Sequence, residues 1–195
     1  SGALISEVAL NYSLLLSALF WTLYKLFFTT NNKLSNFSSL GFGLFGMVLT
    51  IWCILHITLI KSLTEGSHLL LFLILVISFS DIIAYFGGKR FGKSLLAPQI
   101  SPKKTWEGSI FGIIGGGLVG TIFGEHFLSM FWLNGFFLSI SLAIIGQISD
   151  LVESKIKRLC NVKDSGTILP GHGGVLDRID GYLLAAPAFY YFLKF

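Results

Sequence analysis

Long uninterrupted apolar runs dominate the pattern of this chain. They cover residues 4–28, 40–60, 69–87, 108–124, 132–149 and 181–195, with short polar stretches between them. Most of these runs are long enough to cross a hydrocarbon core, which needs roughly 20 apolar residues. Because backbone polar groups in lipid must be satisfied within their own segment, each run is predicted to be a helix. The pattern therefore predicts an all-α fold, a multi-pass membrane helical bundle with about six transmembrane helices.

The composition supports this prediction and excludes other classes. Hydrophobic residues make up 53% of the 195 residues and charged residues 12%, whereas a soluble domain carries about 25% charged residues. The net charge of +4 is small and scattered, so no nucleic-acid partner is expected. The first run is too long, and too polar at its start, for a signal peptide. Cys53 lies in an apolar run and Cys160 in a polar loop, so no disulfide is expected.

The charged residues gather in two windows. Seven of them fall within 81–107 and ten within 150–180, whereas the connection between the fourth and fifth runs carries Glu125 and His126. Since basic loops favour the cytoplasm, we predict cytoplasmic loops at 88–107 and 150–176 and both termini outside. We expect N-terminal transmembrane helices over 1–70 and a catalytic transmembrane domain over 71–195.

Three glycine patterns invite different interpretations. Residues 41–46 satisfy GxGxxG but lie inside an apolar run, so they are assigned to helix packing rather than to a dinucleotide site. Residues 87–94 satisfy the P-loop pattern without a preceding strand; a basic, glycine-rich loop that touches phosphate remains open there. Glycines recur every fourth residue over 108–124. Such a stripe allows close helix approach, within the subunit or at a dimer interface.

Four carboxylates lie in or beside the apolar runs, namely Asp81, Asp150, Asp177 and Asp180. A carboxylate at membrane depth is costly unless it is paired or metal-bound, so it marks a functional site. The alternative is a helix-end charge paired with a neighbouring basic residue. Hard oxygen ligands suit Mg²⁺, which fills its shell with water and substrate phosphates, and nearby Lys and Arg suit phosphate oxygens. These residue types predict phosphoryl or nucleotidyl transfer.

Two polar blocks resemble the signature of the phosphatidate cytidylyltransferase (CDP-diglyceride synthetase) family. One runs from Ser154 to Asp180 and contains Lys163-Asp164-Ser165-Gly166 and Pro170-Gly171-His172-Gly173-Gly174. The other combines Ser80-Asp81 and Gly87-Gly88-Lys89 with Ser101-Pro102-Lys103-Lys104-Thr105-Trp106-Glu107-Gly108. The resemblance covers about 75–195. Family members are usually longer at the N-terminus, so further spans are expected before this chain.

The resemblance implies an enzyme that converts CTP and phosphatidic acid to CDP-diacylglycerol and pyrophosphate in phospholipid biosynthesis. It also implies Mg²⁺ dependence, with room for a monovalent cation such as K⁺, and a homodimer in the cytoplasmic (inner) cell membrane whose active site faces the cytoplasm. A polyprenol (dolichol-type) kinase is the alternative within the membrane CTP-using enzymes. An ion-coupled transporter is the alternative from another class, although no inverted repeat is visible.

The resemblance and the residue chemistry together suggest roles. Metal binding is predicted for Asp150, Asp177 and Asp180, and catalysis for these three with Lys157 and Arg158. Substrate binding is predicted for Ser101, Lys103, Lys104, Thr105, Lys163, Asp164, His172, Gly173, Gly174 and Arg178. Asp81 either joins the substrate site or pairs with a lysine. The Lys104 segment is expected to contact the lipid phosphate, and the loop around His172 the nucleotide.

Overall fold

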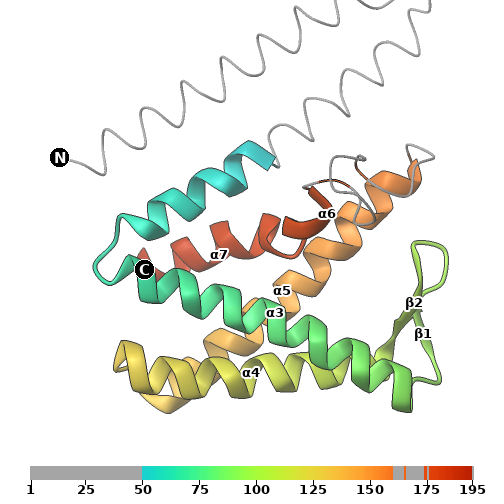
Figure 1. Cartoon of the computed structure of the whole chain (residues 1–195), viewed down its shortest axis with the longest axis horizontal. Coiled ribbons are helices and arrows are strands. Elements are labelled where there is room, and N and C mark those ends of the chain that lie inside the picture. Colours follow the sequence, from blue (N-terminus) through green and yellow to red (C-terminus); the bar gives the residue numbers. More distant parts are fainter. Residues whose placement is uncertain (1–49, 160–164, 166–173, 175, 195) are drawn as a thin grey trace, which may run out of the picture.

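The computed structural model describes residues 50–159, 165, 174 and 176–194, which are predominantly helical (Figure 1). A helix over Thr50–Lys61 precedes the numbered elements. These are α3 (Gly66–Phe91), β1 (Leu95–Ala97), β2 (Ser101–Thr105), α4 (Trp106–Leu128), α5 (Trp132–Leu159), α6 (Leu176–Ile179) and α7 (Tyr182–Lys194). The predicted run 4–28, the start of 40–60, the glycine pattern at 41–46 and Cys160 lie outside the described residues.

Three of the described helices, α3, α4 and α5, are long and apolar enough to cross a membrane. The prediction of a mainly helical fold is therefore confirmed, and three helices within 66–159 have the length and composition that a membrane span requires. By contrast, α7 has 13 residues, or about 20 Å at 1.5 Å per residue, and the described part of the helix at Thr50–Lys61 is also shorter than a full span. The count of six spans stays a prediction.

The glycine stripe brings α3 and α4 into close contact along their length. A Cβ at Gly112 would lie 2.6 Å from the Ser80 carbonyl oxygen, and one at Gly116 would lie 2.9 Å from that of Val76. One turn further, a Cβ at Gly120 would overlap the side chains of Val76 and Ser139. The helices therefore meet backbone to backbone, as small residues permit in a bilayer. The stripe packs within the subunit.

Gly116→Ala is expected to destabilise the protein by about 1–3 kcal/mol, because the added methyl group overpacks the interface of α3, α4 and α5. Gly135→Ala is the matched control on α5, since its Cβ would lie at an ordinary contact distance of 3.6 Å from Thr121. Thermal unfolding of both variants in the same detergent measures the difference. Equal midpoints for the two variants would contradict the close-packing interpretation.

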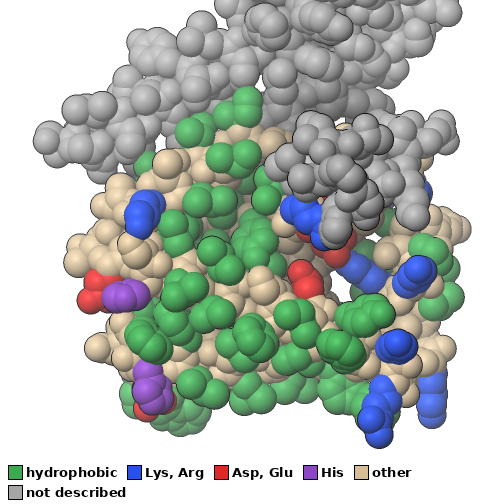
Figure 2. Space-filling model, in the orientation of Figure 1, with side chains coloured by type: hydrophobic (Ala, Val, Ile, Leu, Met, Phe, Trp, Pro, Cys, Tyr) green, Lys and Arg blue, Asp and Glu red, His purple; other side chains and the backbone are tan. Residues whose placement is uncertain are grey.

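Apolar side chains lie both in the core of the bundle and on its outer surface. Phe72 of α3 stacks on Phe189 of α7 with ring centroids 5.5 Å apart, and both belong to the buried hydrophobic cluster. Large apolar side chains also cover the outside of α3 and α4, including Ile82, Ile114 and Ile122. Figure 2 shows these hydrophobic side chains spread over the face of the bundle. An outer surface of this composition is suited to contact with lipid rather than with water.

A short β-hairpin follows α3 and was not predicted from the sequence. β1 and β2 pair antiparallel, with Leu95 opposite Thr105. The hairpin is fixed at its base, where Glu107 of α4 accepts hydrogen bonds from the backbone amides of Lys93 (3.1 Å) and Ser94 (3.2 Å). Thr105 then caps α4 by accepting from the Gly108 amide at 3.2 Å. These contacts hold the hairpin beside the end of the bundle where α3 ends and α4 begins (Figure 1).

Candidate active site

A cavity of about 750 Å³ lies where the end of α3, the hairpin, the start of α4 and the second half of α5 meet. Acidic and basic side chains gather beside an opening on this side of the molecule (Figure 2). Eight of the predicted site residues line the cavity: Asp81, Ser101, Lys103, Lys104, Thr105, Asp150, Asp177 and Asp180. The structure thus brings together residues of the two charged windows that lie far apart in the sequence.

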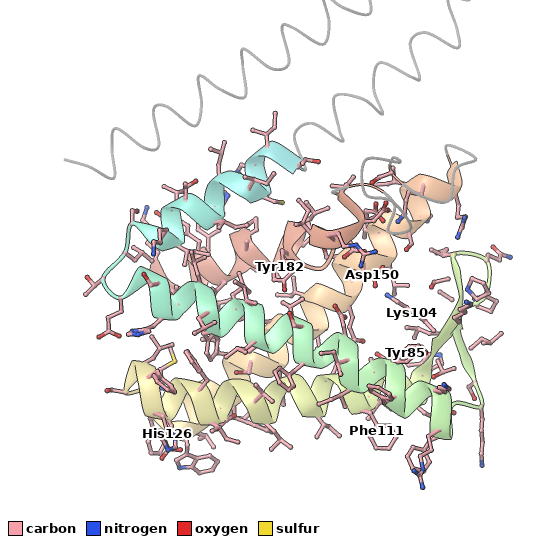
Figure 3. The ribbon with its side chains drawn as sticks, viewed as in Figure 1. Tyr85, Lys104, Phe111, His126, Asp150 and Tyr182 are labelled. Atoms are coloured by element: carbon pink, nitrogen blue, oxygen red, sulfur yellow. The ribbon has the colours of Figure 1, made fainter. Side chains whose placement is uncertain are left out.

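Lys104 of β2 and Asp150 of α5 face each other across the cavity and form an ion pair (Figure 3). Both side chains keep partial access to solvent, at 30% and 23% exposure. Asp150 also accepts a hydrogen bond from the Ser154 hydroxyl at 3.2 Å. Because both ions remain accessible, a phosphate and a cation can compete for them.

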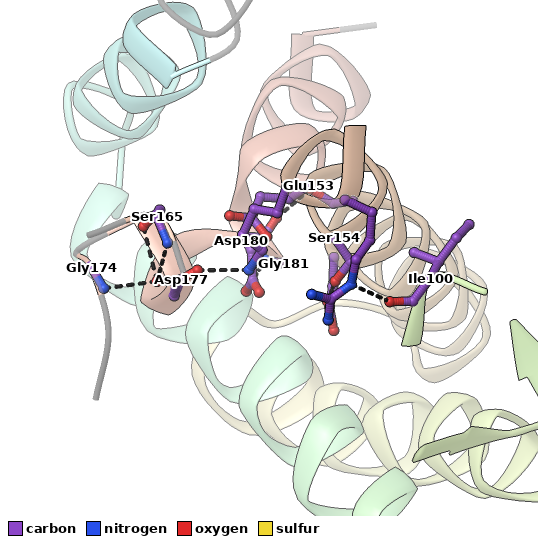
Figure 4. Close-up of polar contacts among 12 residues, drawn as sticks. Ile100, Glu153, Ser154, Ser165, Gly174, Asp177, Asp180 and Gly181 are labelled. Carbon is purple, nitrogen blue, oxygen red and sulfur yellow. Dashed lines mark hydrogen bonds and ion pairs between the residues drawn. The ribbon is translucent and has the colours of Figure 1, made fainter. Parts of the chain in front are cut away.

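Asp177 of α6 is enclosed by donors. Its carboxylate accepts hydrogen bonds from Lys157 Nζ (2.6 Å), from the Ser165 amide and hydroxyl (both 2.9 Å) and from the Gly174 amide (2.7 Å). Figure 4 shows Ser165 and Gly174 converging on this side chain. Burial acts to raise the pKa of Asp177, but the hydrogen bonds outweigh it and hold the pKa well below its usual range. Asp177 therefore joins α5 to both ends of the segment 165–174.

Glu153 is a residue of this region that the site prediction did not include. It is buried, with 2% of its surface exposed. Its carboxylate lies 2.5 Å from Lys157 Nζ, one helical turn away, so Lys157 bridges Glu153 and Asp177. Among the described residues, Glu153 Oε1 has no hydrogen-bond partner. The i, i+4 spacing of Glu153 and Lys157 was readable from the sequence, but their burial was not.

Asp180 and Asp81 differ from the other two aspartates because neither forms an ion pair within the described residues. Asp180 Oδ1 accepts a hydrogen bond from the Gly181 amide at 2.7 Å. Burial and the nearby negative charge of Asp150 raise the pKa of Asp180 to about 7. Asp81 Oδ2 lies beside the same turn, because a Cβ at Gly181 would be 4.0 Å from it. Excess negative charge thus accumulates on one side of the cavity.

The remaining predicted residues have different positions. Arg158 Nε donates to the Ile100 carbonyl at 3.3 Å, which joins the end of α5 to the hairpin (Figure 4). Arg178 is exposed on α6. Neither arginine is among the described residues that line the cavity. Lys163, Asp164, His172 and Gly173 lie outside the described residues.

The P-loop pattern at 87–94 does not form an anion-binding loop in the structure. Its first five residues belong to the last turns of α3. The amides of Lys93 and Ser94, which a phosphate would need, already donate to the Glu107 carboxylate. Lys89, near the end of α3, is among the residues that line the cavity. A phosphate contact here therefore depends on the ammonium group and not on a backbone cradle.

Gln147 of α5 is a polar residue that lines the cavity and that the sequence prediction did not include. Its amide nitrogen donates to the Ser80 hydroxyl (3.2 Å) and to the Ser109 carbonyl (3.1 Å), and its oxygen accepts from the Ser109 hydroxyl. It therefore ties α3, α4 and α5 together next to Asp81 and Asp150. A polar residue inside an apolar run was the available signal.

Comparison with known proteins identifies the family of this chain. A profile of the cytidylyltransferase family matches residues 3–195, so the chain belongs to that family of transferases. Within it, the chain is similar to phosphatidate cytidylyltransferases of several bacteria. That of Rickettsia bellii (strain RML369-C) is 39% identical over 163 residues, which cover 79% of this chain and 70% of the relative. That of Bacillus subtilis (strain 168) is 38% identical over 189 residues, covering 96% and 67%. That of Rickettsia typhi is 42% identical over 161 residues, covering 78% and 70%.

Proposed function

We propose that this chain transfers the cytidylyl group of CTP to phosphatidic acid. An oxygen of the phosphatidate phosphate attacks the α-phosphorus of CTP, the bond from the α-phosphorus to the oxygen bridging to the β-phosphate breaks, and pyrophosphate leaves. The products are CDP-diacylglycerol and pyrophosphate. Membership of the cytidylyltransferase family and the similarity to bacterial phosphatidate cytidylyltransferases support this proposal.

The observation that carries the proposal is the charged cavity at one end of an otherwise apolar bundle. Lys89, Lys103 and Lys104 are among the residues that line it, and lysine ammonium groups suit the oxygens of two phosphorylated substrates. Both members of the Lys104–Asp150 ion pair stay partly exposed to solvent. Charge neutralisation and alignment of the two phosphates are the main tasks in such a transfer, and this cavity supplies groups for both.

Mg²⁺ is the metal that we propose for this site, with Asp150 and Asp180 as its protein ligands and Asp81 nearby. Among the described residues, no three carboxylate, histidine or cysteine side chains converge as a preformed metal cluster. Asp177 is a poorer candidate than the sequence suggested, because Lys157 and three further donors already occupy its oxygens. Mg²⁺ needs only one or two carboxylates, and the uncompensated charge of Asp180 fits a cation. Bound there, Mg²⁺ would neutralise phosphate charge; a K⁺ companion remains a further proposal.

We also propose that the protein lies in the cytoplasmic membrane as a homodimer, with the cavity facing the cytoplasm. The basic residues around the hairpin and at the end of α5 support this orientation, as does the need for cytosolic CTP.

Labelled CTP tests the function directly and separates it from the two alternatives. Purified protein in lipid nanodiscs receives phosphatidic acid or a polyprenol, with CTP labelled at the α- or at the γ-phosphate. We expect α-label, and not γ-label, to enter the lipid when phosphatidic acid is present. Transfer of γ-label to polyprenol would instead identify a kinase. Absence of any transfer, with wild-type folding shown by gel filtration, would contradict the enzyme assignment.

Thiol labelling tests the orientation in intact cells. Single cysteines are placed at Asn134 and at Gln99, both exposed, in a background that lacks Cys53 and Cys160. An impermeant reagent is expected to label the cysteine at 134 from outside and the cysteine at 99 only after lysis. The reverse pattern would overturn the orientation and the proposed access to CTP.

A further inference from the structure

Ser149 lies next to Asp150 on α5 and is buried, with 1% of its surface exposed. Its hydroxyl donates to the main-chain carbonyl of Asp180 and accepts a hydrogen bond from the Leu184 amide at 3.2 Å. Both partners belong to the segment that begins α7. One small side chain therefore joins the Asp150-bearing turn of α5 to the Asp180-bearing turn before α7.

The start of α7 depends on this contact because its own N-cap position has no side chain. The first amides of a helix lack partners within the helix and are usually satisfied by a capping side chain. Here the residue before the helix is Gly181, whose own amide donates to Asp180 Oδ1. The Leu183 amide donates to the Asp180 carbonyl at 3.3 Å. The next amide, that of Leu184, donates to the hydroxyl of Ser149 on the neighbouring helix α5. Ser149 therefore caps α7 from another helix.

Close backbone approach explains why a residue of α5 can reach the start of α7. A Cβ on Gly146 would lie 3.5 Å from the Gly181 carbonyl oxygen and 2.5 Å from Ile77. A Cβ on Gly181 would in turn lie 3.0 Å from Ile77. The two glycines let α5, the start of α7 and α3 meet closely, and the serine hydroxyl bridges the junction one turn further along α5.

We infer that Ser149 is a positioning residue that fixes the carboxylates of Asp150 and Asp180 relative to each other. It does so through the main chain of Asp180 and the cap of α7, without touching a substrate. Adjacent residues of a helix project about 100° apart, so this turn of α5 directs Ser149 to α7 and Asp150 to the cavity. The kinetic consequence rests on the proposed function, whereas the structural part does not.

Ser149→Ala tests the inference, with Ser139→Ala as the matched control. Ser139 is equally buried on the same helix, but its hydroxyl donates to the Gly135 carbonyl within α5, away from the cavity. Hydrogen exchange followed by mass spectrometry on peptides covering 180–190 measures the cap. We expect Ser149→Ala to accelerate exchange at the start of α7 by about tenfold, and the control to leave it unchanged. Unchanged exchange in Ser149→Ala would overturn the inference even if the wild type showed no activity.

Steady-state kinetics measure the consequence for the site. Misplaced carboxylates should lower kcat by about ten- to a hundredfold, while the concentrations of CTP and phosphatidic acid for half-maximal rate change less than about threefold. Faster exchange with an unchanged kcat would refute the positioning role. If the wild-type protein transferred no label in the labelled-CTP assay, that result would count against the proposed function alone, because the exchange experiment does not depend on turnover.

Discussion

Asp180→Asn is expected to abolish cytidylyl transfer while leaving the protein at least as stable as the wild type. Asparagine keeps the shape of the side chain and an oxygen that can accept from the Gly181 amide. It removes a half-buried negative charge that is repelled by Asp150, and relief of like-charge repulsion favours the folded state. Loss of the charge that we propose for cation binding should lower turnover by about a thousandfold, a barrier increase of about 4 kcal/mol.

Asp177→Asn is the variant with which Asp180→Asn is compared, because the two are expected to differ in stability. Asp177 pairs with Lys157 and accepts from the Ser165 and Gly174 amides. Its neutralisation should lower the midpoint of thermal unfolding as well as activity, because it leaves the half-buried Lys157 with one partner fewer. Thermal unfolding and labelled-CTP turnover are measured on both variants. If Asp180→Asn lost stability as Asp177→Asn is expected to, the assignment of Asp180 to the site rather than to the fold would be wrong.

The sequence predicted the features that follow from local pattern and from the solvent. The apolar runs gave α3, α4 and α5 because a bilayer permits few alternatives to helices. The glycine stripe was correctly assigned to helix packing because its four-residue period matches one face of a helix. The four carboxylates were singled out because charge is costly at membrane depth, and all four line one cavity. Each of these inferences needs only the residue and its immediate neighbours.

The sequence could not decide which carboxylate has which partner. Asp177, Asp150 and Asp180 are alike in type and all adjoin apolar runs, yet one is enclosed by donors, one pairs with Lys104, and one has no ion-pair partner among the described residues. These differences depend on where β2 and the start of α7 come to lie. The short strand Ser101–Thr105 has no clear apolar alternation, so the hairpin that carries Lys104 to Asp150 was not predictable.

Lys104→Ala is expected to raise the phosphatidic acid concentration for half-maximal rate by about ten- to a hundredfold, with a smaller change in the dependence on CTP. In the absence of substrate, the Lys104 ammonium neutralises Asp150. Once a lipid phosphate binds, the ammonium can turn to the phosphate and free Asp150 for a cation. Removing a contact made to the bound substrate weakens binding before it affects turnover, which is why the lipid dependence should change most.

A charge-exchanged pair separates this role from simple structural pairing. Lys93→Ala is the control for loss of a lysine near the hairpin, since Lys93 is exposed and contributes its backbone amide to Glu107. The double variant Lys104→Asp with Asp150→Lys preserves an ion pair between β2 and α5. We expect it to unfold at a temperature close to that of the wild type and to be inactive. The new carboxylate at 104 would face the lipid phosphate, and the new ammonium group at 150 would face the cation. Recovery of wild-type turnover in the exchanged pair would show that the two residues only hold the hairpin against α5.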